Sequence, residues 1–333
     1  MKRSKSVQQS IGGIAVEKER SALHDVIENI ERVVVGKREE IELSLTALLA
    51  RGHVLLEDVP GVGKTMMVRA IARSVGAEFK RIQFTPDLLP SDVSGISIYN
   101  QKTQSFEFRP GPVMSNVVLA DEINRTSPKT QSALLEALEE GSVTIDGSTR
   151  ILEDPFFVMA TQNPIEYGGT YPLPEAQLDR FLFKLKMGYP TYDQELDVLK
   201  RVEQKHPIEE LEEVLSLDEI LQMQDEVTSV YVDDSVKQYI VSIVSETRTH
   251  RDVQLGVSPR GSISLMKASQ AFAYLRGRDY VIPDDVKHLA PVTLSHRVIL
   301  RSDLQMVEKD GDDVIREVLS TLRVPLSKQE TVQ

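Results

Sequence analysis

The residues with the clearest chemical potential lie in one short loop, between an apolar run and an amphipathic segment. Residues 53–56 suit a buried parallel strand, and residues 64–75 carry apolar side chains at helical spacing. Gly61 and Gly63 let the loop turn its backbone N–H groups inward around a phosphate, and Lys64 adds a positive charge for the outer phosphates. This arrangement predicts a P-loop, a site for nucleotide phosphates, rather than an unrelated strand-to-helix turn.

One position departs from the general P-loop pattern, G-x-x-x-x-G-K-[ST], because Asp58 stands where the first glycine is expected. That position only starts the turn, and aspartate tolerates turn geometry, so we expect nucleotide binding to survive. At the other end of the motif, Thr65 offers a hydroxyl to Mg²⁺. The predicted cofactor-binding residues are Asp58, Pro60, Gly61, Val62, Gly63, Lys64, Thr65 and Met66.

A pair of carboxylates follows a second apolar run. Residues 116–120 suit a buried strand, and Asp121 and Glu122 come directly after it. Because parallel sheets bind ligands at the carboxyl ends of their strands, we expect the pair to lie beside the P-loop. We predict that Asp121 holds Mg²⁺ through its water ligands, together with Thr65, and that Glu122 polarises the attacking water. A solvated acid pair at a strand end is the alternative, and the P-loop upstream disfavours it.

Three further residues give weaker signals. Asn163 follows the apolar run at 156–160 and is able to orient a water, although in isolation a turn-forming asparagine before proline is the better explanation. Arg180 precedes an alternating strand at 181–187, and spacing does not separate it from a surface ion-pair partner. Arg260 falls in the first turn of a helix, where a cation opposes the helix dipole and indicates an anion nearby.

The apolar residues Val34 and Val35, with Gly36, precede the nucleotide strand. They are suited to wall an adenine pocket, and ordinary core packing is an equally good interpretation of their spacing.

The order of strand and helix signals predicts two domains. Alternating signals over residues 21–188 predict an α/β core, a five-stranded parallel sheet between helices, with hairpin inserts at about 96–108 and 143–151. Residues 189–320 show helical patterns alone and predict an all-α lid domain. Residues 1–20 are expected to be a flexible N-terminus, and residues 321–333 a C-terminal tail.

Composition narrows the function classes. The chain has 333 residues and a formal net charge of −12, which disfavours a broad nucleic-acid surface. It has no cysteine, which excludes disulfides and thiolate metal sites, and its six histidines show no metal-ligand spacing. Neither a signal peptide nor a membrane span is predicted, and we expect a cytoplasmic location.

The chain resembles the MoxR family of AAA+ ATPases, and the resemblance extends over about residues 20–320. Five motifs carry it: LEDVPGVGKT at 56–65, ADEINR at 120–125, ATQNP at 160–164, EAQLDRF at 175–181 and VSPR at 257–260. The resemblance implies roles that spacing does not supply. Asn163 matches the sensor-1 position, Arg180 the arginine finger that reaches a neighbouring subunit's γ-phosphate, and Arg260 the sensor-2 arginine of the lid.

The resemblance also implies ATP and Mg²⁺ as cofactors, and a homo-oligomeric, hexameric ring that remodels, assembles or activates protein partners in a chaperone-like way. Proposed partners in the family include proteins with von Willebrand factor A domains. The two predicted hairpins match inserts of the clade that also contains magnesium chelatase motors and replicative helicases. A motor acting on DNA or transcription, and a chelatase-type motor for metal insertion, remain the alternatives. The sequence lacks the N-K-x-D motif that reads guanine, which disfavours a GTPase.

Overall fold

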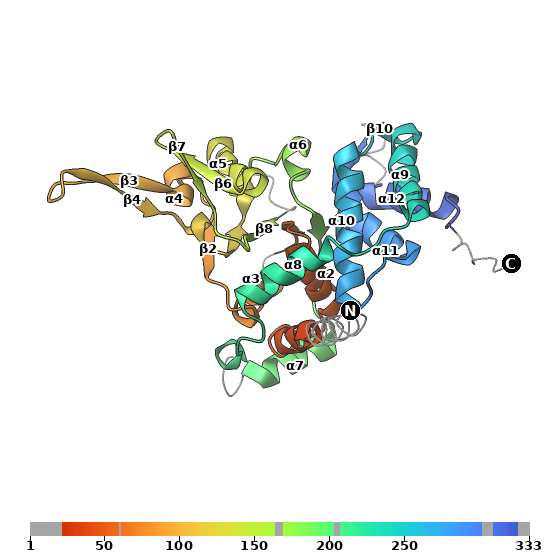
Figure 1. Ribbon diagram of the computed structural model, residues 1–333, viewed down its shortest axis with the longest axis horizontal. Helices are drawn as coiled ribbons and strands as arrows, with labels where there is room; N and C mark the ends of the chain where they lie inside the picture. The colour runs from red at the N-terminus through yellow and green to blue at the C-terminus, as the bar shows by residue number, and fades with distance from the viewer. Residues whose placement is uncertain (1–21, 60, 164–168, 203–206, 302–308, 326–333) are drawn as a thin grey trace, which may run out of the picture. The chain divides into compact units, whose positions relative to one another are not determined.

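The computed structural model describes residues 22–59, 61–163, 169–202, 207–301 and 309–325 (Figure 1). The chain divides into two compact units, Met1–Asp225 and Glu226–Gln333. Within the described ranges, no helix combines the length and apolar character needed to cross a membrane.

A five-stranded parallel sheet forms the centre of the first unit, as the sequence predicts. The strand order is β2-β5-β8-β1-β9, so the P-loop strand lies between the two strands added last along the chain. All four pairings in the sheet are parallel. The strands are β1 (Val54–Glu57), β2 (Phe79–Gln83), β5 (Val117–Asp121), β8 (Phe157–Gln162) and β9 (Phe183–Leu185).

Helices cover the sheet on both faces, which explains why its strands read as continuous apolar runs. Leu55, Ala120 and Ala160 are adjacent in register and belong to the core cluster that includes the apolar side of α5 (Pro128–Glu140). The apolar residues that alternate with them along each strand point to the opposite face of the sheet and are equally buried. The helices α2 (Arg38–Leu49) and α3 (Lys64–Ser74) contact the sheet, α2 along β9 and α3 along β2 and β5.

Two hairpins extend from this core at the predicted positions. β3 (Gly95–Asn100) pairs with β4 (Ser105–Pro110), and β6 (Ser142–Ile145) pairs with β7 (Ser148–Ile151). The β3–β4 ribbon reaches away from the sheet (Figure 1). The Arg150 guanidinium lies 3.8 Å from the centre of the Phe108 ring, which joins one hairpin to the other.

Short helices complete the first unit beyond the sheet. We predicted a domain boundary after residue 188, where the sheet ends, whereas the division between compact units falls after Asp225. Contacts back to the core account for the difference: Arg201 donates to the carbonyls of Glu31 and Arg32, and Arg51 pairs with Asp225 at 2.8 Å. The helices of this unit outside the sheet region are α4 (Pro90–Ser94), η1 (Pro112–Met114), η2 (Ile123–Arg125), α6 (Glu175–Leu178), α7 (Tyr192–Val202), η3 (Pro207–Glu210) and most of α8 (Leu217–Val227), which crosses the boundary.

The second unit is mainly helical, in agreement with the predicted lid. It also contains a two-stranded antiparallel sheet that the sequence did not indicate, because two and three residues are too few to show alternation. Its elements are α9 (Asp234–Thr249), β10 (Val253–Leu255), α10 (Pro259–Leu275), α11 (Pro283–Leu294), η4 (Ser295–Arg297), β11 (Ile299–Leu300) and α12 (Gly311–Thr321).

Candidate nucleotide-binding site

The glycines of the predicted P-loop adopt the backbone conformation that the motif requires. Gly61 has φ 88° and Gly63 has φ 92°, both in the left-handed region that side chains rarely adopt. Apart from the chain neighbours of each glycine, no described residue has a heavy atom within 4 Å of the position that a Cβ would take. Gly63 is the N-cap of α3, so the loop opens onto the free N–H groups of a helix N-terminus. This open cradle fits a phosphate group.

Lys64 begins α3 and folds back over the loop. Its Nζ donates a hydrogen bond to the carbonyl oxygen of Asp58 at 2.9 Å. Burial lowers the pKa of the Lys64 ammonium from its usual value, and the negative charges of Asp58, Asp121 and Glu122 oppose that shift. The carboxylates favour the charged form of the lysine, and its partial desolvation strengthens its attraction for a phosphate.

A cleft of about 500 Å³ lies at the carboxyl edge of the sheet. It brings together eight predicted site residues from three separate parts of the chain. It also contains three residues that the sequence analysis missed, which are Arg81, Gln83 and Thr161. The predicted residues lining it are Gly61, Gly63, Lys64, Thr65, Met66, Asp121, Glu122 and Asn163.

The hydroxyl of Thr161 holds both members of the acid pair. It donates to Asp121 Oδ1 at 2.6 Å and accepts the backbone N–H of Glu122 at 2.8 Å. Glu122 has φ 58° and ψ 49°, a left-handed conformation that costs a non-glycine residue about 1–2 kcal/mol. Because such strain persists only where surrounding contacts impose it, the Thr161 hydroxyl is part of what fixes the Glu122 backbone.

Strand β2 supplies a second set of contacts to the same pair. Arg81 forms an ion pair with Asp121 Oδ2 at 2.7 Å and donates to Gln83 Oε1 at 2.6 Å. Gln83 in turn donates to Glu122 Oε2 at 2.7 Å. Gln83 lies opposite Asp121 in the β2–β5 ladder, at the carboxyl end of its strand. That strand-end position is the signal that could have identified it from the sequence, once the strand order was known.

The residues proposed for Mg²⁺ are compatible with that ion. Thr65 and Asp121 line the same cleft, and hydroxyl and carboxylate oxygens are the ligand types that Mg²⁺ takes in proteins. The Asp121 side chain is 15% exposed, so its carboxylate remains accessible from the cleft.

An apolar pocket of about 190 Å³ lies next to the P-loop. Val34 and Val35 line it, as expected for the wall of an adenine pocket, whereas Gly36 is not among its lining residues. Val62 and Met66 line it from the P-loop side, so one loop serves both the apolar pocket and the polar cleft. The other lining residues are Val33, Lys37, Gly61, Gly63, Pro190, Val198, Arg201 and Pro207.

Asp58, Arg180 and Arg260 are not among the described residues that line the cleft. Asp58 is buried beneath the loop, and Pro60 lies outside the described residues. Arg180 follows α6 and pairs with Glu139 of α5 at 2.8 Å. Arg260 lies in the first turn of α10, in the second unit. The roles of Arg180 and Arg260 toward a nucleotide stay predictions.

Comparisons with known proteins identify the family of this chain. The family described as "ATPase family associated with various cellular activities (AAA)" matches residues 53–183, and an AAA lid domain matches residues 245–318. Chaperone MoxR1 of Mycobacterium tuberculosis is 44% identical over 312 residues, which cover 91% of this chain and 82% of that protein. The chain belongs to the MoxR family of AAA+ ATPases.

Two further proteins extend the comparison within the MoxR family and its fold. The protein YeaC of Bacillus subtilis is 66% identical over 306 residues, which cover 92% of this chain and 96% of YeaC. A crystal structure from Cytophaga hutchinsonii shares 38% identity and superposes with a TM-score of 0.90, covering 96% of this chain and 99% of that one. The fold of this MoxR-family chain therefore has a closely similar solved counterpart.

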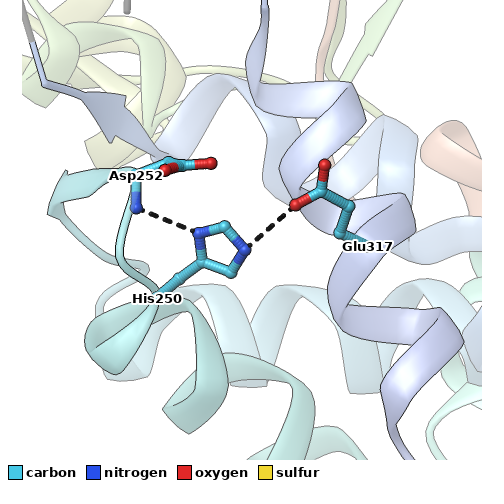
Figure 2. A group of neighbouring side chains, drawn as sticks. All are labelled: His250, Asp252 and Glu317. Carbon is cyan, nitrogen blue, oxygen red and sulfur yellow. Dashed lines mark hydrogen bonds and ion pairs between the residues drawn. The ribbon is translucent and has the colours of Figure 1, made fainter. Parts of the chain in front are cut away.

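A cluster of potential ligands in the second unit has a different explanation. His250, Asp252 and Glu317 lie near one another, with His250 Nε2 3.3 Å from Glu317 Oε2 (Figure 2). Lys309 Nζ donates to both carboxylates at 2.7 Å and lowers the pKa of each. An ammonium therefore already offsets part of their negative charge and bridges the two carboxylates, and we assign the cluster a structural role that joins α12 to the chain around β10.

Proposed function

We propose that this chain is a Mg²⁺-dependent ATP hydrolase that acts in a ring of like subunits and remodels, assembles or activates protein partners. The observation that carries the proposal is the meeting of Lys64, Asp121 and Glu122 at one cleft, beside an apolar pocket suited to a nucleobase. Membership of the MoxR family supports an ATPase, and a homologue that bears the name chaperone supports protein clients.

The chain's own groups divide the work of hydrolysis. The glycine loop and Lys64 bind and orient the phosphates, while Thr65 and Asp121 would hold Mg²⁺. When bound, the ion neutralises charge on the β- and γ-phosphates. Glu122 polarises the attacking water, and Asn163, in the sensor-1 role, orients it. The hydrogen bond that Gln83 donates to Glu122 Oε2 orients the carboxylate for this role.

Other parts of the proposal concern assembly, partners and location. In the proposed hexameric ring, Arg180 acts on the nucleotide of a neighbouring subunit, and Arg260 acts as sensor 2 on the nucleotide of its own chain. Proteins with von Willebrand factor A domains are the proposed partners, and the cytoplasm is the proposed location. The net charge of −12 supports protein partners over nucleic acid.

Two variants test the division of labour. Lys64→Ala is expected to lose ATP binding, because it removes the cation over the phosphate cradle. Glu122→Gln is expected to bind ATP normally and to hydrolyse it at least about 100-fold more slowly, because the carboxylate that polarises water is gone. Calorimetry with ATP and Mg²⁺, followed by a phosphate-release assay, measures both. Equal loss of binding in the two variants would contradict the assignment.

The same phosphate-release assay tests the kind of partner. Addition of DNA is expected to leave turnover unchanged, since no basic surface is proposed. Strong stimulation by DNA that disappears at higher salt would favour the nucleic-acid alternative.

A further inference from the structure

Asp58 makes contacts that the start of a turn does not require. Its carboxylate Oδ1 accepts the backbone N–H of Val59 at 2.9 Å, and its Oδ2 accepts the backbone N–H of Gly188 at 2.6 Å. Its own carbonyl oxygen accepts the hydrogen bond from Lys64 Nζ. One residue thus contacts the P-loop backbone, the phosphate-binding lysine and a segment that lies 130 positions further along the chain.

The environment of Asp58 makes these contacts strong. The residue is only 9% exposed, and a buried carboxylate is costly unless it is hydrogen-bonded and paired with a cation. Two main-chain N–H groups supply the hydrogen bonds, and Lys64 supplies the nearby positive charge. Hydrogen bonds to an ionised acceptor are about twice as strong as neutral ones.

The segment that Asp58 holds leads directly to the apolar pocket. Gly188 follows β9 and has φ 64°, a left-handed turn after which Pro190 reaches the pocket wall. Lys37, which also lines the pocket, donates to the carbonyl oxygen of Met187. The turn between β9 and the pocket wall is therefore held on one side by Lys37 and on the other by Asp58.

We propose that Asp58 is a positioning residue that fixes the P-loop and the 187–190 wall of the apolar pocket at one separation, so that the phosphates and the base of a nucleotide bind together. This inference rests on the proposed ATP binding. A glycine at this position, as in the general P-loop pattern, keeps the loop and its N–H groups but offers no carboxylate to Gly188. Asp58 should therefore matter for the whole nucleotide and much less for its phosphates alone.

The first test separates these two contributions. ATP and inorganic tripolyphosphate are titrated, with Mg²⁺, into the full chain and into Asp58→Gly and Asp58→Asn. In the asparagine variant, the amide oxygen can still accept one main-chain N–H, but the amide NH₂ faces the other. Because two donors cannot form a hydrogen bond, one of the two contacts is lost. Asp58→Asn is expected to weaken ATP binding about tenfold, the equivalent of one charge-assisted hydrogen bond, and Asp58→Gly, which loses both contacts, at least as much. Tripolyphosphate binding is expected to change by less than about threefold.

Glu57→Gln is the matched control for the first test. Glu57 precedes Asp58 at the end of β1 and pairs with Lys184 of β9 at 2.8 Å, but it is not among the residues that line either pocket. Its variant should bind ATP as the unchanged protein does. If Asp58→Gly and Asp58→Asn also bind ATP normally, or lose tripolyphosphate as strongly as ATP, the inference is overturned. Failure of the unchanged protein to bind ATP would instead reject the proposed function.

The second test addresses the other end of the contact. Gly188→Ala keeps the N–H group but strains the left-handed turn, and apart from the two chain neighbours no described residue has a heavy atom within 4 Å of the added Cβ. Gly188→Asn is the control, because asparagine tolerates this conformation. Gly188→Ala should weaken ATP binding, and the double variant with Asp58→Asn should lose less than the product of the single effects. Independent, multiplicative losses would mean that Asp58 does not act through Gly188.

Discussion

The two ends of the parallel sheet each bury an ionisable nitrogen group, but the surroundings differ. Burial outweighs the other influences on the group at the amino end, whereas carboxylates at the carboxyl end favour the charged form. At the amino end, His53 precedes β1; its Nδ1 accepts the Val158 N–H at 3.2 Å, and its ring packs edge-on against Phe156. Burial lowers the pKa of His53 to about 4, so the ring is neutral. At the carboxyl end, burial also lowers the pKa of Lys64, but three carboxylates act against that shift.

This difference shows which features distinguish a site from a core. Burial of an ionisable group is common to both ends, and at His53 it accompanies satisfied hydrogen bonds and regular packing. Only the carboxyl end combines burial with opposing charges, an open glycine cradle and the left-handed backbone of Glu122. Perturbed charge and imposed strain together indicate function, whereas desolvation alone indicates packing.

The largest expected effect tests whether the carboxyl-end site is complete within one chain. Arg180→Ala should bind ATP and lose turnover by about 10³–10⁵, the range for an arginine supplied to a phosphoryl group by a neighbouring protein. Activity per chain should also rise with protein concentration as rings assemble. Mixing Arg180→Ala with inactive Glu122→Gln should restore hydrolysis, because a site with intact Glu122 then receives an intact Arg180. Phosphate release from mixtures, under conditions where chains exchange, measures this.

Glu139→Gln is the control for Arg180, because Glu139 is its ion-pair partner within the chain. If Arg180 serves only that pair, the two variants should share one mild defect. If Arg180 acts on a neighbouring nucleotide, Glu139→Gln should retain most of the turnover. Mixtures as inactive as their parents would show that Arg180 does not act across a subunit boundary.

The next effect concerns the amino end and affects stability rather than catalysis. The pKa of His53 is about 4 in the folded state, below its ordinary value of 6.5. His53 therefore binds a proton more readily in the unfolded chain than in the folded one. The folding stability that is present above pH 6.5 is lost as the pH falls toward 4. The linkage amounts to about 3 kcal/mol in the free energy of unfolding. Urea unfolding, followed by circular dichroism between pH 7 and 4, measures it.

His53→Gln isolates this contribution, because glutamine keeps a donor and an acceptor but does not titrate. The unchanged protein should be the more stable at pH 7, and its advantage should shrink by about 3 kcal/mol at pH 4. Since every other titrating group is common to both proteins, a difference that stays constant with pH would show that His53 is protonated without penalty in the fold.

Local patterns were sufficient to predict the parts of the site that one segment contains. The P-loop, the acid pair and the position of Asn163 each follow an apolar run, and the rule that parallel strands present ligands at their carboxyl ends predicted that they meet. The five-stranded sheet and both hairpins were predictable for the same reason, because each strand carries its own signal of burial or alternation.

Contacts between distant segments were not predictable. Gln83 reaches Glu122 because β2 pairs with β5, and the strand order is not contained in any local pattern. Asp58 looked like a turn residue, and only the folded chain brings it to Gly188. The boundary between compact units is a third case, since the contacts of Arg201 and Asp225 with the core depend on tertiary packing.

The smallest of the three effects concerns the hydroxyl that organises the acid pair. Thr161→Val keeps the shape of the side chain, yet it removes the donor to Asp121 Oδ1 and leaves the Glu122 N–H without its acceptor. Turnover should fall about 10- to 100-fold, as for other residues that orient a metal-holding carboxylate, while ATP binding without metal should change little. Thr161→Ser restores the hydroxyl and should restore turnover, which separates the hydrogen bonds from the packing. Equal turnover in the valine and serine variants would mean that β5 and the contacts from Arg81 and Gln83 set the geometry of Asp121 and Glu122 without Thr161. In that case the contrast between the two ends of the sheet would rest on charge and not on imposed strain.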